Sequence, residues 1–123
     1  MNKDMKRDKI TISENKVIVT GSNIWMTITE LAGLFDATVG AVNSAIKAII
    51  KSDVLNDYEV CAYVRLENGN NADVYNMEVV TALSFRLNTY PAAVFRRWLV
   101  KGATAPRRTT PPIVIQYKGG LLN

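Results

Sequence analysis

The chain has 123 residues, of which 48% are hydrophobic and 21% are charged, values typical of one ordinary globular domain. With one cysteine and no histidine, the sequence excludes an internal disulfide, a Cys/His zinc site and the catalytic units that need histidine. The formal net charge of +4 is unevenly placed, because residues 91–123 hold six basic and no acidic side chains. Such a basic segment favours a polyanionic partner, for example nucleic acid.

The sequence offers little for catalysis or membrane insertion. Its apolar runs stay short of the roughly 20 residues that a membrane helix needs, and its polar start does not resemble a signal peptide. A cytoplasmic location is the expectation. The glycines form no phosphate-binding motif, and Glu30 and Asp36 are isolated carboxylates. We therefore expect no enzymatic activity, no metal site and no cofactor.

The first predicted elements form a β-hairpin. Residues 1–9 are polar and of mixed charge, and we expect them to be disordered. Two short stretches rich in β-branched side chains, Ile10–Ser13 and Val17–Thr20, predict strands joined by a turn at residues 14–16.

Two helices are predicted next. A hydroxyl at Thr27 or Thr29 can cap the first, and the Thr27–Glu30 spacing fits a capping box. The second helix is expected from about Val39 to Ile50, since apolar residues recur there at helical spacing. Its inward side chains are Val42, Ile46 and Ile49.

A second hairpin and two further helices follow. Strands are predicted over Val60–Leu66 and Asp73–Tyr75, with Asn68-Gly69 as the turn signal. This hairpin directly follows the helix pair, which is the position of a wing. Helices are predicted from Met77 to about Leu87 and from Pro91, at the first helical position, to Gly102. Phe95 and Trp98 lie on the apolar stripes of these helices and are predicted to be core residues. Trp25 is predicted to be a core residue for the same reason.

The C-terminal residues have a different character. Residues 105–112 are a Pro/Arg-rich linker, and Ile113–Tyr117 is an apolar strand-like stretch that needs a partner. It is expected to add to a sheet edge of its own chain or of a second copy, the latter giving a homodimer.

The stretch between residues 28 and 47 fits a helix-turn-helix motif. Ala32 is the small residue at which two tightly packed helices would touch, Asp36 tolerates a left-handed turn, and Thr38 can cap the second helix. An ordinary helix hairpin is the alternative interpretation. The expected fold is α+β, a winged helix-turn-helix-like domain over residues 10–102, with a linker and strand-like tail over 103–123.

Such a fold predicts a DNA interface on the second helix, because a protruding helix fits the major groove. Asn43 suits adenine, and Lys47 suits guanine or phosphate. Arg86, Arg96 and Arg97 are alternative phosphate contacts. For Arg86 and Arg96 we favour a structural role, in which they pair with Glu78 or Asp73 and tie the helices to the wing. The predicted contacts with double-stranded DNA are Thr38, Asn43, Ser44, Lys47, Lys51, Arg97, Arg107 and Arg108.

Two blocks of sequence resemble a known family. Residues 23–35, NIWMTITELAGLF, and residues 74–88, VYNMEVVTALSFRLN, followed by FRRWL at 95–99, resemble the N-terminal domain of the RhuM virulence-protein family. The likeness spans roughly residues 17–102. The second block is also similar to the BRO and antirepressor N-terminal domains of phages and large DNA viruses. The resemblance implies a non-enzymatic, DNA-binding transcription regulator from a bacterial mobile element or phage.

The same comparison leaves an alternative function open. Members of that family carry more polar and basic residues where this chain has Val39, Gly40 and Ala45. A protein-interaction module of antirepressor type, without direct base readout, is therefore the second hypothesis. A structural accessory protein of a conjugative or phage element is a third.

Overall fold

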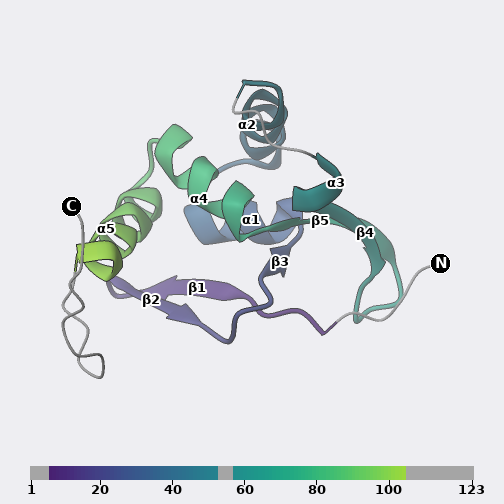
Figure 1. Cartoon of the computed structure of the whole chain (residues 1–123), viewed down its shortest axis with the longest axis horizontal. Helices are drawn as coiled ribbons and strands as arrows, with labels where there is room; N and C mark the ends of the chain where they lie inside the picture. The colour runs from purple at the N-terminus through teal and green to yellow at the C-terminus, as the bar shows by residue number, and fades with distance from the viewer. Residues whose placement is uncertain (1–5, 53–56, 105–123) are drawn as a thin grey trace, which may run out of the picture.

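The computed structural model describes residues 6–52 and 57–104, and it shows a mixed α+β fold (Figure 1). The described part contains two small antiparallel sheets, with strand orders β1-β2 and β3-β5-β4. The strands are β1 (Ile10–Ser13), β2 (Lys16–Val19), β3 (Trp25–Met26), β4 (Cys61–Arg65) and β5 (Asn71–Asn76). The helices are α1 (Ile28–Phe35), α2 (Val39–Ser52), α3 (Asp57–Val60), α4 (Met77–Arg86) and α5 (Tyr90–Thr104).

The predicted N-terminal hairpin is confirmed. Ser13 pairs with Lys16 across a two-residue turn, in which Glu14 and Asn15 have φ values of 51° and 66°. Positive φ at both turn residues matches the right-handed twist of the strands and closes the hairpin tightly. Alternation along the strands turns one face toward α1 and α5 and leaves the other in solvent.

The segment before the hairpin belongs to the fold, in contrast to the disorder expected over residues 1–9. The backbone N–H of Asp8 donates to Asn23 O at 2.9 Å, and its carboxylate accepts from the Thr20 hydroxyl and the Asn23 N–H. Arg7 is buried, with 8% of its surface exposed. Residues 6–9 are thus held in place, and residues 1–5 lie outside the described part.

The helix pair forms where the sequence predicts it. Thr27 caps α1 in a full capping box with Glu30, and Asp36 ends α1 in the left-handed conformation at φ 54°. The Ala37 N–H donates to Ala32 O at 3.0 Å, and the Thr38 hydroxyl accepts from the Ala41 N–H at 3.0 Å. Across this three-residue break the chain direction turns by 108° from α1 to α2. In the described residues no single helix is apolar and long enough to cross a membrane, and only this bent pair reaches that length and composition.

The second hairpin, β4–β5, is also confirmed, with two differences. Its pairing runs from Cys61–Tyr75 to Arg65–Asn71, and Gly69 takes φ 90° in the turn. The strand begins one residue later than predicted, because Val60 closes a helical turn, α3, that the sequence analysis missed. Tyr75 and Asn76 also pair with the short strand β3, which ties the hairpin to the start of α1.

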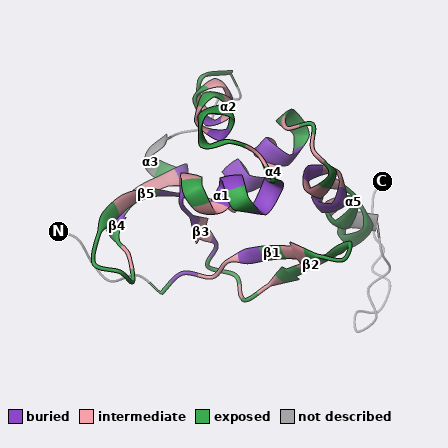
Figure 2. Cartoon of the chain, turned by 180° about the vertical axis from the view of Figure 1, so that it is seen from behind, coloured by how far each residue is buried: buried purple, intermediate pink, exposed green. Residues whose placement is uncertain are grey.

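Helices α4 and α5 enclose the core. Asn76 caps α4 by accepting from the Glu78 and Val79 N–H groups. The rings of Phe35 in α1 and Phe95 in α5 meet edge to face, with centroids 5.7 Å apart. The buried side chains of α1, α2 and α4 join them in one continuous cluster. In Figure 2 the purple, buried stretches of α1 and α4 lie near the centre of the ribbon.

Helix α5 departs from its predicted bounds at both ends. It begins at Tyr90, one residue before Pro91, and the Thr89 hydroxyl accepts from the Ala92 N–H at 3.3 Å. It continues through Gly102 to Thr104, since a glycine costs a helix only about 1 kcal/mol and does not by itself end it. The linker and strand-like stretch predicted over residues 105–123, and any dimer through them, lie outside the described residues.

Candidate nucleic-acid interface

The outer side of α2 is the surface on which the sequence places DNA contacts. Ser44, Lys47 and Lys51 are exposed there, with spacings of three and four residues that put them on one stripe. Figure 2 shows α2 standing at the edge of the molecule with exposed positions along it. The opposite stripe, Val42, Ile46 and Ile49, is buried against the core. The helix therefore presents one polar face to solvent while the other anchors it.

The electrostatics of this face suit an anionic partner. Helix α2 carries Lys47 and Lys51 and no acidic side chain. Asp36 in the turn before α2 is an exposed acidic side chain. Its backbone is in the left-handed conformation, which aspartate tolerates better than most residues. Because exposed lysines contact phosphate as mobile point charges, this arrangement supports contacts with a backbone more readily than base-specific contacts.

The first turn of α2 carries small, exposed side chains. Gly40 and Ala41 are exposed, and a Cβ added at Gly40 would meet nothing within 4 Å. Val39 beside them is 50% exposed although it is apolar. Packing inside the domain therefore does not require small side chains here. Small residues on an outer helix face let another surface approach the backbone closely.

Two predicted contact residues have partly internal roles. Thr38 is occupied as the cap of α2, so its hydroxyl oxygen already accepts the Ala41 N–H. Asn43 is half-buried. Ser44, Lys47 and Lys51 remain as the exposed set that the structure brings together on one helix face.

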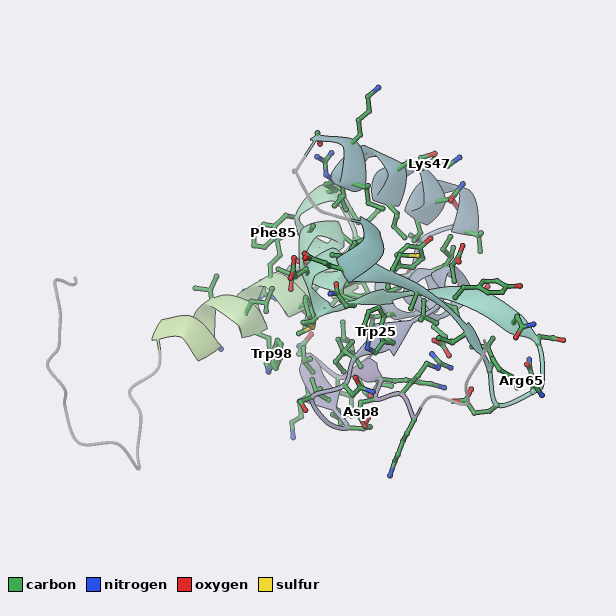
Figure 3. All side chains as sticks on the ribbon, turned by 45° about the vertical axis from the view of Figure 1, so that its right-hand side comes forward. Asp8, Trp25, Lys47, Arg65, Phe85 and Trp98 are labelled. Carbon is green, nitrogen blue, oxygen red and sulfur yellow. The ribbon has the colours of Figure 1, made fainter. Side chains whose placement is uncertain are left out.

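Arg97 lies elsewhere. It belongs to α5, which packs against α4, α1 and the N-terminal hairpin, whereas α2 packs against α4 and α1. In Figure 3 Lys47 is at the top of the molecule, and Trp98, next to Arg97 in the sequence, is well below it. Arg97 is therefore not part of the α2 surface. Arg107 and Arg108, also predicted contacts, lie outside the described residues.

The hairpin expected to act as a wing is held at its turn by Arg7. Arg7 donates to Glu67 Oε1 at 2.9 Å, and the Asn68 side chain accepts the Asn70 N–H within the turn. Figure 3 places Arg65, on β4 near this turn, low on the molecule and Lys47 at its top. The turn and the outer stripe of α2 thus do not converge on one compact site.

The buried guanidinium of Arg7 stabilises the start of the helix pair. Arg7 donates to Trp25 O and Glu30 Oε1, both at 2.8 Å, and to Glu30 Oε2 at 3.2 Å. Partial burial acts to raise the pKa of Glu30, but the bonds from Arg7, the Thr27 N–H and Lys9 outweigh it and lower that pKa to about 2. The hydrogen bond with Glu30 in turn raises the pKa of Arg7. The charged pair fixes the start of α1.

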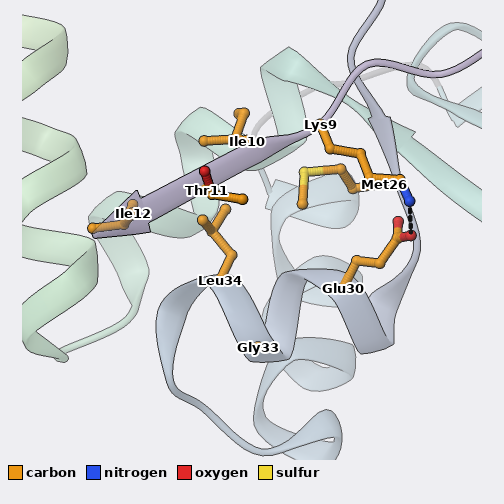
Figure 4. A pocket seen from close by; sticks show the side chains of 8 residues that line it. All are labelled: Lys9, Ile10, Thr11, Ile12, Met26, Glu30, Gly33 and Leu34. Carbon is orange, nitrogen blue, oxygen red and sulfur yellow. Dashed lines mark ion pairs between the residues drawn. The ribbon is translucent and has the colours of Figure 1, made fainter. Parts of the chain in front are cut away.

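Glu30 also closes one end of a cavity of about 320 Å³ between β1 and α1 (Figure 4). Lys9 Nζ lies 3.2 Å from Glu30 Oε2 at this end, and Ile10, Met26 and Leu34 form apolar walls. The carboxylate is shared among three segments of the chain and stays ionised. These contacts give Glu30 a structural role at the start of α1.

Arg86 and Arg96 join helices to one another, whereas the sequence predicted that they tie the helices to the wing. Arg96 donates to Ser84 O and Leu87 O, which fastens α5 to the end of α4. Arg86 donates to the Ser52 hydroxyl at 2.9 Å, linking α4 to the end of α2. Both arginines act through oxygens of neighbouring helices, where Glu78 and Asp73 had been predicted.

The sequence did not predict two features of the structure. Arg7 gave no signal, because its partners lie 23 and 60 residues away. The second is a groove of about 480 Å³ between β2 and α5, lined by Lys16, Arg97 and Lys101 around Ile18 and Trp98. The four-residue spacing of Arg97 and Lys101, on the stripe beside Trp98, was the available clue.

Comparisons with known proteins add no relative: no protein-family model, curated protein or solved structure matches the chain. In the part of the chain that the structure describes, no group of three or more acidic or cysteine side chains could hold a metal ion.

Proposed function

We propose that this chain is a DNA-binding domain of the helix-turn-helix class, in which α2 lies in the major groove. The observation that carries the proposal is the helix pair, whose direction turns by 108° across the three residues between Phe35 and Val39. Helix-turn-helix motifs join two helices at about 90–120° through a turn of three or four residues. The second helix of such a pair is the one that enters the groove.

The exposed face of α2 supports the same proposal of DNA binding. It offers Lys47 and Lys51 to phosphates, a hydroxyl at Ser44, and small side chains near its start. With few long polar side chains, this face favours non-specific contact over base readout. The resemblance to RhuM and antirepressor N-terminal domains points in the same direction. We propose regulation of transcription in a mobile element or phage as the context.

A salt titration of binding to a labelled random duplex tests the proposal. For two phosphate contacts, the logarithm of the association constant should fall against the logarithm of salt concentration with a slope of about −2. Lys47→Glu and Lys51→Glu together should abolish the binding and its salt dependence. The matched control is Arg97→Glu with Lys101→Glu on α5, which reverses the same number of charges away from α2. Absence of duplex binding at low salt, or equal losses in both variants, would contradict the proposal.

A further inference from the structure

The groove between β2 and α5, hereafter the β2–α5 groove, has an unbalanced charge. Lys16 on the strand and Arg97 and Lys101 on the helix line it, and none of the described residues lining it is acidic. Arg97 and Lys101 are exposed, one helical turn apart. Three cations on two sides of one groove create a positive field that only an anionic occupant would neutralise.

The floor of the groove is apolar and open. Ile18 is 51% exposed and Trp98 36% exposed, although both are large apolar side chains. Trp98 packs on the buried ring of Phe95, with ring centroids 5.3 Å apart. The bond from the Tyr90 hydroxyl to the Asn15 side chain joins α5 to the hairpin turn beside it. An occupant would gain free energy by covering these side chains.

The strand that lines the groove has an unpaired edge. Within the described residues β2 pairs only with β1, through Lys16, Ile18 and then Thr20, whose N–H donates to Lys9 O at 3.1 Å. Alternation in an antiparallel pair then turns the backbone groups of Val17 and Val19 outward. Val17 faces the inside of the domain and Ile18 faces solvent, yet both line the groove. Because side chains from both faces of β2 reach the groove, it runs along the unpaired edge of β2.

We propose that the β2–α5 groove binds an extended, acidic segment of a partner protein, which adds as a strand to the free edge of β2. Carboxylates of the segment pair with Lys16, Arg97 and Lys101, and its apolar side chains cover Ile18 and Trp98. An open strand edge beside pockets for side chains is the recognition mode that peptides use in strand addition. Nucleic acid has no backbone that continues a β-ladder, which is why a peptide fits the groove better.

Two other occupants lack the required charge. Residues 105–123 of this chain carry Arg107, Arg108 and Lys118 and no acidic side chain. A second copy pairing through β2 would bring its own Lys16, Arg97 and Lys101 toward the same three cations. The proposal goes beyond the proposed function and does not rest on it, because α2 contributes nothing to the groove.

The test uses the full chain and labelled peptides in an anisotropy titration. The acidic peptide has four β-branched apolar residues flanked by glutamates. A basic peptide has lysines in place of the glutamates, and a third is acidic but N-methylated on its apolar residues, so that it cannot form a ladder. The acidic peptide should bind at least tenfold more tightly than either control. Arg97→Glu with Lys101→Glu should weaken it at least tenfold, while Lys47→Glu with Lys51→Glu on α2 leaves it unchanged.

Several results would overturn the proposal. The first is equal binding of the acidic and basic peptides, or of the N-methylated and plain acidic peptides. The second is that the Arg97→Glu, Lys101→Glu variant loses duplex binding and keeps peptide binding, which would assign the groove to nucleic acid. The third is that the parent chain has the mass of a dimer in solution and the same variant has the mass of a monomer. That result would assign the groove to a second copy. Circular dichroism confirms that each variant is folded. Failure of the α2 variant to change duplex binding would count against the proposed function alone.

Discussion

Arg7 and Glu30 are 23 residues apart in the sequence, and their side chains meet at 2.8 Å. The Arg7 side chain is 1% exposed and that of Glu30 is 26% exposed, so the pair is largely withdrawn from water. The same Glu30 oxygen accepts the Thr27 N–H at 2.9 Å in the capping box of α1. One carboxylate therefore holds both the N-terminal segment and the start of the helix pair.

Replacing Glu30 by glutamine should destabilise the fold. The change removes the charge that compensates the buried Arg7, and we expect the free energy of unfolding to fall by about 1–3 kcal/mol. Glu67→Gln is the matched control, because that side chain is 63% exposed and should cost less than about 1 kcal/mol. Urea unfolding of both variants measures the difference. Equal losses would mean that burial of the pair does not matter.

The stabilisation that Glu30 provides should depend on pH. Its pKa is lowered from the usual 4.5 to about 2 in the folded chain. A carboxyl with a lowered folded pKa contributes stability that is present above its unfolded pKa and is lost as pH falls through the folded value. The gap in unfolding free energy between parent and Glu30→Gln should thus be constant above about pH 5 and shrink toward pH 2. A gap that stays constant down to pH 2 would contradict the assigned pKa.

Gly21 and Gly33 should respond oppositely to alanine. A Cβ at Gly21 would lie 2.3 Å from Asp8 Oδ2, so the carboxylate would have to leave its bonds with Thr20 and Asn23. We expect Gly21→Ala to cost about 1–3 kcal/mol. At Gly33, inside α1, the added methyl meets nothing within 4 Å, and Gly33→Ala should stabilise by about 0.5–1 kcal/mol. Thermal melts of the two variants should shift in opposite directions, and a shared direction would refute the packing around Asp8.

Ala32 tests the close approach of the two helices. It is 7% exposed, and its carbonyl accepts the N–H of Ala37 in the turn. Ala32→Leu should force α1 and α2 apart and cost about 1–3 kcal/mol. Ala41→Leu is the control, since Ala41 is exposed on α2 and the larger side chain enters solvent there. If chemical denaturation found the two leucine variants equally stable, the tight helix pair would be wrong.

Local signals in the sequence predicted most of the elements. The capping box at Thr27 and Glu30 and the left-handed Asp36 depend on neighbours within a few residues, and both are confirmed. The N-terminal hairpin follows from β-branched alternation and a short turn in the same way. Such interactions are encoded within one window of sequence, which is why they can be read without a structure.

Features that depend on distant residues could not be read in this way. Trp98 falls on the same stripe as Phe95, yet it is 36% exposed, because the hairpin covers only one side of α5 and leaves the groove open. Arg7 stands in a polar segment with no periodicity, and only tertiary structure brings Glu30 and Glu67 to it. Of the residues predicted to point outward from α2, Ser44, Lys47 and Lys51 are exposed, whereas Asn43 is half-buried. Arg97 lies on α5, away from that face, and the sequence alone does not give the relative placement of the two helices.

The position of Arg7 has a practical consequence for protein production. A shortened chain that begins at Ile10, where β1 starts, keeps the strands and helices of the described residues but loses the Arg7 guanidinium and the Lys9 ammonium. Glu30 and Glu67 would then lie near one another without the cation that now joins them. Limited digestion or a tag fused at Ile10 would thus weaken the start of α1 from a distance, and expression boundaries are better placed before Lys6.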